Sequence, residues 1–93
     1  MTNFLDTLTA IITNRKTNPK PGSYTNDLLA NQTKAAQKVG EEAAEVLVAA
    51  LAQSDQRLTE EMADLIYHSL VLLESREIPW ARVLDELQRR HSP

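Results

Sequence analysis

Apolar residues recur at helical spacing along almost the whole chain, and this periodicity limits what the chain can fold into. Residues 2–15 show it clearly, with apolar side chains at Phe4, Leu5, Leu8, Ile11 and Ile12. Spacings of three and four residues place such side chains on one face of a helix. The alternating patterns of strands are absent, glycine occurs only twice, and the helix-favouring residues Ala, Leu, Glu and Gln dominate. The sequence therefore predicts an all-α fold, an antiparallel bundle of four to five helices.

The breaks between the helices are marked by prolines, glycine and capping residues. Two prolines and a glycine predict an irregular, polar loop over residues 16–22, because both residue types interrupt helices. Ser54 and Asp55 offer an N-cap for the helix that follows, and Pro79 suits the first turn of the last helix. Asn31 is a suitable turn residue, because asparagine tolerates the left-handed conformation. The predicted helices cover residues 2–15, 23–29, 32–53, 56–75 and 79–91.

The length of the chain predicts one domain over residues 1–93 with a core of modest size. The 56–75 helix is apolar nearly all round beyond its acidic start, which is typical of a helix buried in a bundle or at a subunit interface. In the last helix we expect the apolar residues to face inward. These are Trp80, Val83, Leu84 and Leu87. We therefore expect a homo-oligomer whose subunits share a core.

The composition excludes several classes of function. The formal charge is −3 and no basic tail or stripe is present, which argues against nucleic-acid binding. The absence of cysteine excludes disulfides, zinc–cysteine sites and thiol catalysis. No apolar run approaches the roughly 20 residues of a membrane span, and residues 1–6 do not resemble a signal peptide. These features predict a cytoplasmic protein that binds neither nucleic acid nor membranes.

Two pairs of acidic residues are the strongest indication of chemistry. Glu42 and Glu45 lie three residues apart in one predicted helix, and Glu61 and Asp64 lie three apart in the next. Residues three apart point to the same side of a helix, so each helix offers two carboxylates beside its apolar stripe. Two such pairs on adjacent antiparallel helices would form an oxygen-rich cage suited to Mg²⁺. The alternative is that these acids are solvated on exposed helix faces.

Residues near the acidic pairs each allow two interpretations. Lys38 is either a phosphate-binding charge or a surface partner for Glu42, one helical turn away. His68 is either a hydrogen-bond partner behind the site or a buried interface histidine. Gly40, inside a predicted helix, costs about 1 kcal/mol relative to alanine, which indicates a tight helix contact or a ligand lying close.

Basic and hydroxyl-bearing residues elsewhere in the chain are further candidates. Ser23, Tyr24 and Thr25 bring three hydroxyls together directly after the loop that contains Lys20. They are either substrate contacts or a helix cap with its neighbours. Arg90 belongs to a basic chain end, which either compensates the helix dipole or meets phosphate across an oligomer interface.

These motifs together resemble a known family. Glu41-Glu42-x-x-Glu45 followed by Glu61-x-x-Asp64 is similar to the signature of the all-α nucleoside triphosphate pyrophosphohydrolases, the MazG-like superfamily. Within that superfamily the chain looks like the phosphoribosyl-ATP pyrophosphohydrolases of histidine biosynthesis. The closer resemblance covers residues 4–91 and rests on Ser23-Tyr24-Thr25, Lys38-Val39-Gly40-Glu41-Glu42-Ala43 and Ala63-Asp64-Leu65-Ile66-Tyr67-His68. Glycines expected from the family pattern near Asn31 and near Glu77 are absent.

The resemblance implies Mg²⁺-dependent hydrolysis of phosphoribosyl-ATP to phosphoribosyl-AMP and pyrophosphate, by a homodimer or a dimer of dimers. It implies metal ligands at Glu42, Glu45, Glu61 and Asp64. The candidates for orienting the attacking water are Glu41 and the ligands, among them Glu45. The candidates for binding the substrate are Lys20, Ser23, Tyr24, Lys38, His68 and Arg90. Two alternatives stay open: a housecleaning pyrophosphatase for non-standard nucleoside triphosphates, and a non-catalytic helical dimerisation module.

Overall fold

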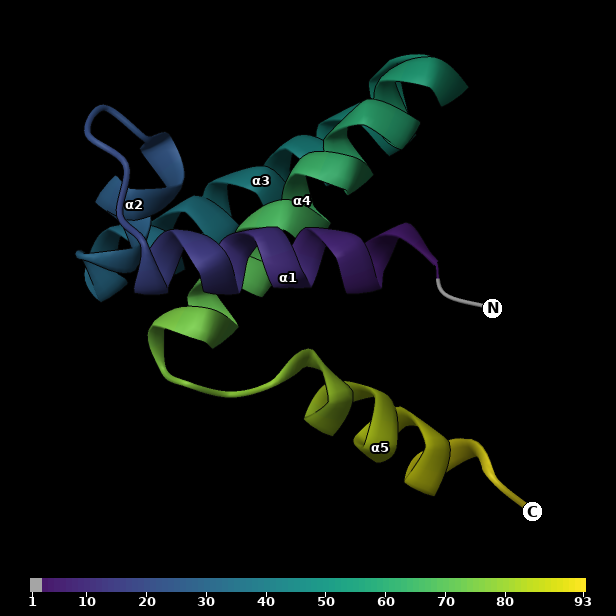
Figure 1. The fold of residues 1–93 in the computed structure, drawn as a ribbon. Helices are drawn as coiled ribbons and strands as arrows, with labels where there is room; N and C mark the ends of the chain where they lie inside the picture. The colour runs from purple at the N-terminus through teal and green to yellow at the C-terminus, as the bar shows by residue number, and fades with distance from the viewer. Residues whose placement is uncertain (1–2) are drawn as a thin grey trace.

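The structure, a computed structural model, describes residues 3–93 of the chain, and these form helices joined by short connections (Figure 1). Within the described residues there is no strand, which confirms the predicted all-α fold. In chain order the helices are α1 (Phe4–Thr17), α2 (Tyr24–Leu29), α3 (Gln32–Ala52), α4 (Asp55–Ser75) and α5 (Trp80–His91). The predicted helix start at residue 2 lies outside the described residues. Asn3 caps α1 by accepting the Asp6 N–H at 3.3 Å.

The two longest helices, α3 and α4, lie side by side and antiparallel, and α1 and α2 cover one end of this pair (Figure 1). The buried apolar core lies where these four helices meet. Its members are Ile12, Leu28, Ala35, Leu70 and Val71. The other end of the pair projects past α1 and α2 in Figure 1. There Leu51 is 87% exposed, so the single chain leaves this end uncovered.

Helix α1 runs two residues further than predicted, through Lys16 and Thr17. Proline restricts mainly the residue before it, so Pro19 forces only Asn18 out of helical geometry. The prediction that the loop begins at Lys16 is therefore wrong. The Lys16 ammonium donates to the Glu74 carbonyl at 3.0 Å, which ties the end of α1 to the end of α4.

The two turns where a glycine was expected differ in backbone conformation. Asn31 has φ −138°, so it is not left-handed; its side chain instead caps α3 by accepting the Lys34 N–H at 3.1 Å. Glu77 does adopt the left-handed conformation, with φ 58°. The Ile78 N–H there donates to the Leu73 carbonyl at 2.9 Å, which ends α4 in the manner of a glycine-based cap.

Helix α5 stands apart from the other four helices (Figure 1). It has no buried residue, and Leu84 and Leu87 are about half exposed. Only Trp80, at its start, packs against the core, which confirms its role as a core anchor. The prediction that Leu84 and Leu87 face inward is wrong for the single chain, because the bend after α4 directs α5 away from the bundle. Pro79 precedes the helix as its N-cap rather than lying in its first turn.

Two further expectations concern close packing and membranes. A side chain at Gly40 would meet no atom within 4 Å, so no tight helix contact explains this glycine among the described residues. The described helices include none that is both long and apolar enough to cross a bilayer.

Candidate active site

Three carboxylates converge between α3 and α4. Glu42 and Glu45 point to the same side of α3 because they lie three residues apart, and Glu61 faces them from the antiparallel α4. One oxygen from each of the three lies within 4.8 Å of the others. We call Glu42, Glu45 and Glu61 the acidic cluster. The predicted meeting of carboxylates from both helices is thus present for three of the four residues.

Two members of the acidic cluster are deeply buried. Glu42 is 6% exposed and Glu61 is 5% exposed, and in each the Oε2 atom has no hydrogen-bond partner. Burying a carboxylate oxygen that has no hydrogen-bond partner costs free energy, because the oxygen loses its hydrogen bonds to water and forms none with the protein. Carboxylate oxygens held this close together are the donor set that a hard divalent cation such as Mg²⁺ prefers. The cluster therefore has the chemistry of a cation site.

Glu45 is the exposed member of the cluster, and the neighbouring carboxylates change its pKa. Its hydrogen bonds with Glu61 and Glu42, together with repulsion from their charges, raise its pKa to about 7. Carboxylates that crowd together resist ionising at the same time. In the chain without a cation, Glu45 therefore keeps its proton to a higher pH than an isolated glutamate does.

Asp64 and Glu41 lie outside the acidic cluster. Asp64 is exposed, and its carboxylate is not among the three that converge, although it lies only three residues from Glu61 on α4. Its backbone carbonyl accepts a hydrogen bond from the ring of His68, at 2.7 Å. Glu41 is exposed on α3 and pairs with Lys38 at 3.2 Å.

Lys38 lies beside the acidic cluster on α3. Its ammonium contacts Glu41 at 3.2 Å and the buried Glu42 at 3.5 Å, through Glu42 Oε1. The hydrogen bond to Glu41, foremost among the causes, raises the Lys38 pKa and keeps the side chain charged. The predicted pairing with Glu42 is thus confirmed. Lys38 occupies one oxygen of Glu42 and leaves the other free.

Arg57 makes the equivalent contacts on α4, and the sequence analysis overlooked it. Its guanidinium pairs with Glu60 and with the buried Glu61, through Glu61 Oε1. The signal was present in the sequence. Lys38-x-x-Glu41-Glu42-x-x-Glu45 and Arg57-x-x-Glu60-Glu61-x-x-Asp64 have the same pattern, a cation followed three and four residues later by glutamates. Both patterns place a cation one helical turn before a buried glutamate.

A hydrogen-bonded chain joins α2 to α4 at the Lys38 end of the site. The Asp64 carbonyl can only accept, so the Nδ1 atom of His68 donates to it. In the neutral ring Nε2 then accepts from the Tyr24 hydroxyl, at 2.9 Å. Burial, opposed by the charge of Lys38, raises the Tyr24 pKa. Next to this pair, the hydroxyls of Thr25 and Tyr67 hydrogen-bond each other. His68 thus links the Tyr24 side chain on α2 to the backbone of α4.

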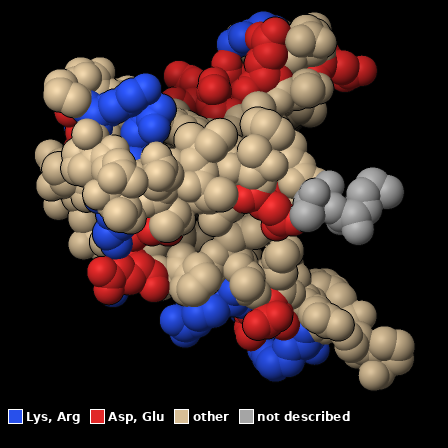
Figure 2. Space-filling view, viewed as in Figure 1, with Lys and Arg blue, Asp and Glu red and all other residues tan. Residues whose placement is uncertain are grey.

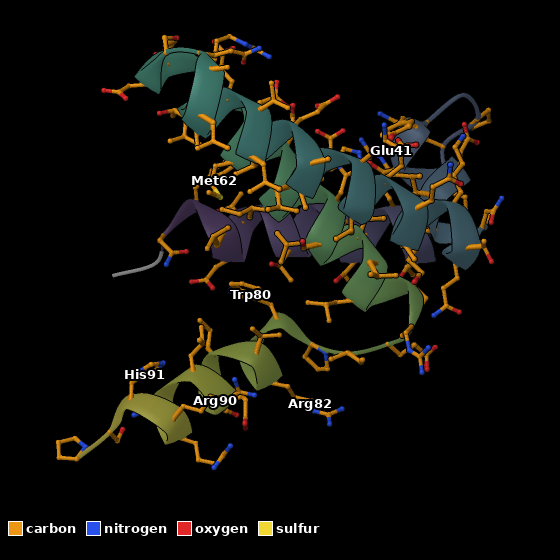
Figure 3. The ribbon with its side chains drawn as sticks, turned by 180° about the vertical axis from the view of Figure 1, so that it is seen from behind. Glu41, Met62, Trp80, Arg82, Arg90 and His91 are labelled. Carbon is orange, nitrogen blue, oxygen red and sulfur yellow. The ribbon has the colours of Figure 1, made fainter. Side chains whose placement is uncertain are left out.

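The remaining predicted residues lie in different parts of the chain. Ser23 caps α2 by accepting the Asn26 N–H at 3.2 Å. Lys20 is exposed in the preceding loop, where its backbone N–H donates to Asn26 Oδ1 at 2.8 Å. Arg90 lies on α5, paired with Glu86 at 3.1 Å, and Figure 3 shows it apart from Glu41 on α3. The single chain does not bring Arg90 to the acidic cluster.

Charged side chains on the surface gather in two groups, one over the α3–α4 pair and one on α5. Figure 2 shows acidic side chains gathered over the projecting α3–α4 pair, with basic side chains beside them. A second mixed group of basic and acidic side chains lies on α5, where Arg89 and Arg90 both pair with Glu86. An anionic substrate would therefore need a cation to approach the acidic cluster.

Known proteins are similar to the chain along nearly its whole length. A family model described as phosphoribosyl-ATP pyrophosphohydrolase matches residues 5–91. A phosphoribosyl-ATP pyrophosphatase of Metallosphaera sedula is 49% identical over 92 residues, which cover 97% of this chain and 98% of that protein. The one of Sulfurisphaera tokodaii is 48% identical over 89 residues, covering 95% of each chain. The one of Methanocella arvoryzae is 39% identical over 93 residues, covering 97% of this chain and 98% of that protein.

Proposed function

Because the chain belongs to the phosphoribosyl-ATP pyrophosphohydrolase family, we propose that it hydrolyses phosphoribosyl-ATP to phosphoribosyl-AMP and pyrophosphate, with Mg²⁺ as its cofactor. The family makes it a hydrolase that acts on a pyrophosphate bond in histidine biosynthesis. Among the structural observations, the two partnerless buried oxygens of Glu42 and Glu61 support the proposal most directly. A bound cation would satisfy these two oxygens and thereby stabilise the acidic cluster. Such a cation would in turn bind the phosphate groups of a polyphosphate substrate.

The acidic cluster fits Mg²⁺ by its donor atoms and by its unsatisfied charge. Glu42, Glu45 and Glu61 would hold the ion, and we propose that Asp64 joins them from α4 after a change of its side-chain rotamer. When bound, Mg²⁺ neutralises phosphate charge and lowers the pKa of nearby water. Lys38 keeps Glu42 oriented by occupying one of its oxygens.

The other residues of the site would bind the substrate and move protons. Glu41 and Glu45 are exposed carboxylates beside the buried pair, so either is placed to accept the proton of the attacking water. Lys38 and the Tyr24 hydroxyl, which His68 holds, would contact phosphate or ribose oxygens at one end of the site. Lys20 and Ser23 precede Tyr24 in the chain and would extend this contact.

We also propose that the active form is a homodimer or a dimer of dimers, acting in the cytoplasm. Apolar side chains stay exposed at the projecting end of α3 and on α5. They include Leu47, Val48, Leu51, Leu84 and Leu87. A second copy would cover them, and Arg90 would then reach phosphate in a partner's site. Light scattering coupled to size-exclusion chromatography measures the mass; a monomer at micromolar concentration would contradict this part.

Pyrophosphate release from phosphoribosyl-ATP, with Mg²⁺ and with EDTA, tests the function. We expect Mg²⁺-dependent release, reduced by about two orders of magnitude or more in Glu45→Gln and in Asp64→Asn. Asp85→Asn on α5, an equivalent change away from the acidic cluster, serves as the control and keeps wild-type activity. Faster turnover of ordinary or non-standard nucleoside triphosphates than of phosphoribosyl-ATP would support the housecleaning alternative and refute the proposal. No release from any of these substrates would refute both.

A further inference from the structure

A hollow adjoins the acidic cluster at the end away from Lys38 and Tyr24. It has a volume of about 230 Å³ and is lined by Glu45, Val48, Gln53, Arg57 and Glu61. Two of its lining residues belong to the acidic cluster, so a group seated in it would lie directly beside a cation held there. The hollow also contains the one basic side chain of the α4 motif.

Arg57 is held in this hollow by acids of its own helix. Its guanidinium pairs with Glu60 and Glu61, which lie three and four residues further along α4. The hydrogen bond with Glu60 is the largest cause of its raised pKa, so the group is charged at any physiological pH. Yet its side chain stays 48% exposed, so the guanidinium is fixed in direction and remains accessible from solvent.

The two cation motifs lie at opposite ends of the acidic cluster. Lys38 precedes Glu42 on α3, and Arg57 precedes Glu61 on α4. Because α3 and α4 run antiparallel, residues that precede the cluster on one helix lie at the opposite end from those that precede it on the other. Lys38 accordingly lies toward Tyr24, whereas Arg57 lies toward Val48 and Gln53.

Resting on the proposed function, we propose that Arg57 binds a phosphate group of the polyphosphate in this hollow, opposite Lys38. A planar guanidinium offers two parallel N–H donors, which suit phosphate better than a single ammonium does. The hollow lies at the N-terminal end of α4, where the helix dipole favours an anion, and the Gln53 amide lines the same space. The polyphosphate would thus extend across the cation site with a basic group at each end.

The competing explanation is that Arg57 only forms a surface ion pair within α4. Such a pair contributes little to stability and nothing to substrate affinity. The two explanations differ in what Arg57→Gln changes. Loss of a phosphate contact raises the KM and weakens inhibition by pyrophosphate, whereas loss of a surface pair changes neither. A role in holding Glu61 for the metal would instead weaken Mg²⁺ binding when no substrate is present.

The experiment compares Arg57→Gln and Arg57→Lys with Arg76→Gln. Arg76 is the control, because it is an exposed arginine at the opposite end of α4 from Arg57. For each variant we would measure the KM for phosphoribosyl-ATP, inhibition by inorganic pyrophosphate with Mg²⁺, and Mg²⁺ binding alone by calorimetry. Circular dichroism checks folding.

We expect Arg57→Gln to raise the KM and the pyrophosphate inhibition constant by about tenfold or more, the effect of losing a charged hydrogen bond. Arg57→Lys should recover part of this loss, Arg76→Gln should match wild type, and Mg²⁺ binding alone should not weaken. Unchanged constants in Arg57→Gln, or an equal loss of Mg²⁺ affinity, would overturn the proposal. Inactive wild-type protein would refute the proposed function, and direct titration with magnesium pyrophosphate would still test whether Arg57 binds phosphate.

Discussion

The two ends of the α3–α4 pair are built in opposite ways. At the end that α1 and α2 cover, the helices bury apolar side chains, and Leu28 and Val71 have no exposed surface. Toward the other end they bury Glu42 and Glu61, each with an oxygen that has no partner. Burial of apolar surface stabilises a fold, whereas burial of unpaired charge destabilises it.

This difference indicates that one end of the pair provides stability and the other provides chemistry. A small domain has little stability to spare, so the acidic cluster depends on the core beside it. Substitutions at the two ends should therefore have opposite consequences. Those in the core should cost stability, and those in the acidic cluster should cost activity while leaving the metal-free chain as stable or more stable.

Removing core volume tests the first half of this comparison, and it has the largest expected effect. Leu28→Ala should lower the free energy of unfolding by about 2–5 kcal/mol, because Leu28 is fully buried and its loss leaves a cavity. Urea denaturation measures this. In the dissociated single chain, the same substitution at the projecting end, Leu51→Ala, should cost less than about 0.5 kcal/mol, because Leu51 is 87% exposed there. Equal costs in the dissociated chain would contradict the comparison, whereas a cost of Leu51→Ala that appears only in the assembled protein is what the proposed subunit interface predicts.

Replacing a buried acid tests the second half. Glu61→Gln keeps the shape of the side chain but removes a charge whose Oε2 atom has no partner. We expect Mg²⁺ affinity to fall on the order of 100-fold, because a ligand is lost. In EDTA we expect the free energy of unfolding to rise by about 1 kcal/mol, because the new amide can donate to a neighbouring carboxylate. Calorimetry and urea denaturation measure the two changes. A less stable Glu61→Gln in EDTA would show that the acidic end is not strained.

The pH dependence of stability sharpens the comparison further. The pKa of Glu45 is raised from its usual 4.5 to about 7 by Glu61 and Glu42. Between these values the folded chain keeps a proton that the unfolded chain has lost, so folding stability declines as pH rises from 4.5 to 7. In EDTA the unfolding free energy of the wild type should therefore decline across this window, and that of Glu45→Gln should decline less. Parallel profiles for the two proteins would contradict this assignment. Mg²⁺ binding should strengthen over the same pH window, because it displaces the proton.

Much of this arrangement could be predicted from the sequence, because it depends on local spacing. Helical periodicity gave all five helices to within two residues at the ends that could be compared, and three-residue spacing placed Glu42 and Glu45 on the side of α3 that faces Glu61. The pairing of Lys38 with Glu42 also follows from spacing alone. Such features are fixed by the geometry of a single helix.

Most features that sequence reasoning missed depend on how the helices pack. One depends on a sequence motif whose likeness to the Lys38 motif was overlooked. Spacing cannot tell in which direction a helix leaves the bundle, so the exposure of Leu84 and Leu87 on α5 was not foreseen. That the Asp64 carboxylate is not among those that converge also cannot be read from spacing. The role of Arg57 could have been found, because its motif repeats that of Lys38.

The smallest expected effect concerns the stable end alone, at the turn that ends α4. Glu77 holds a left-handed φ of 58°, which costs a residue with a side chain about 1 kcal/mol relative to glycine. Glu77→Gly should therefore raise the free energy of unfolding by about 1 kcal/mol without changing Mg²⁺ affinity. It also removes the ion pair with Lys16, at 3.4 Å, but the Glu77 side chain is largely exposed and such pairs contribute little.

Glu77→Ala is the control, because it removes the same ion pair and keeps the strained backbone. Glycine more stable than alanine by this margin, in urea denaturation, assigns the gain to the backbone. Equal stability of the two variants would show that the turn stores no strain, and a change in Mg²⁺ affinity would show that the two ends of the α3–α4 pair are not independent.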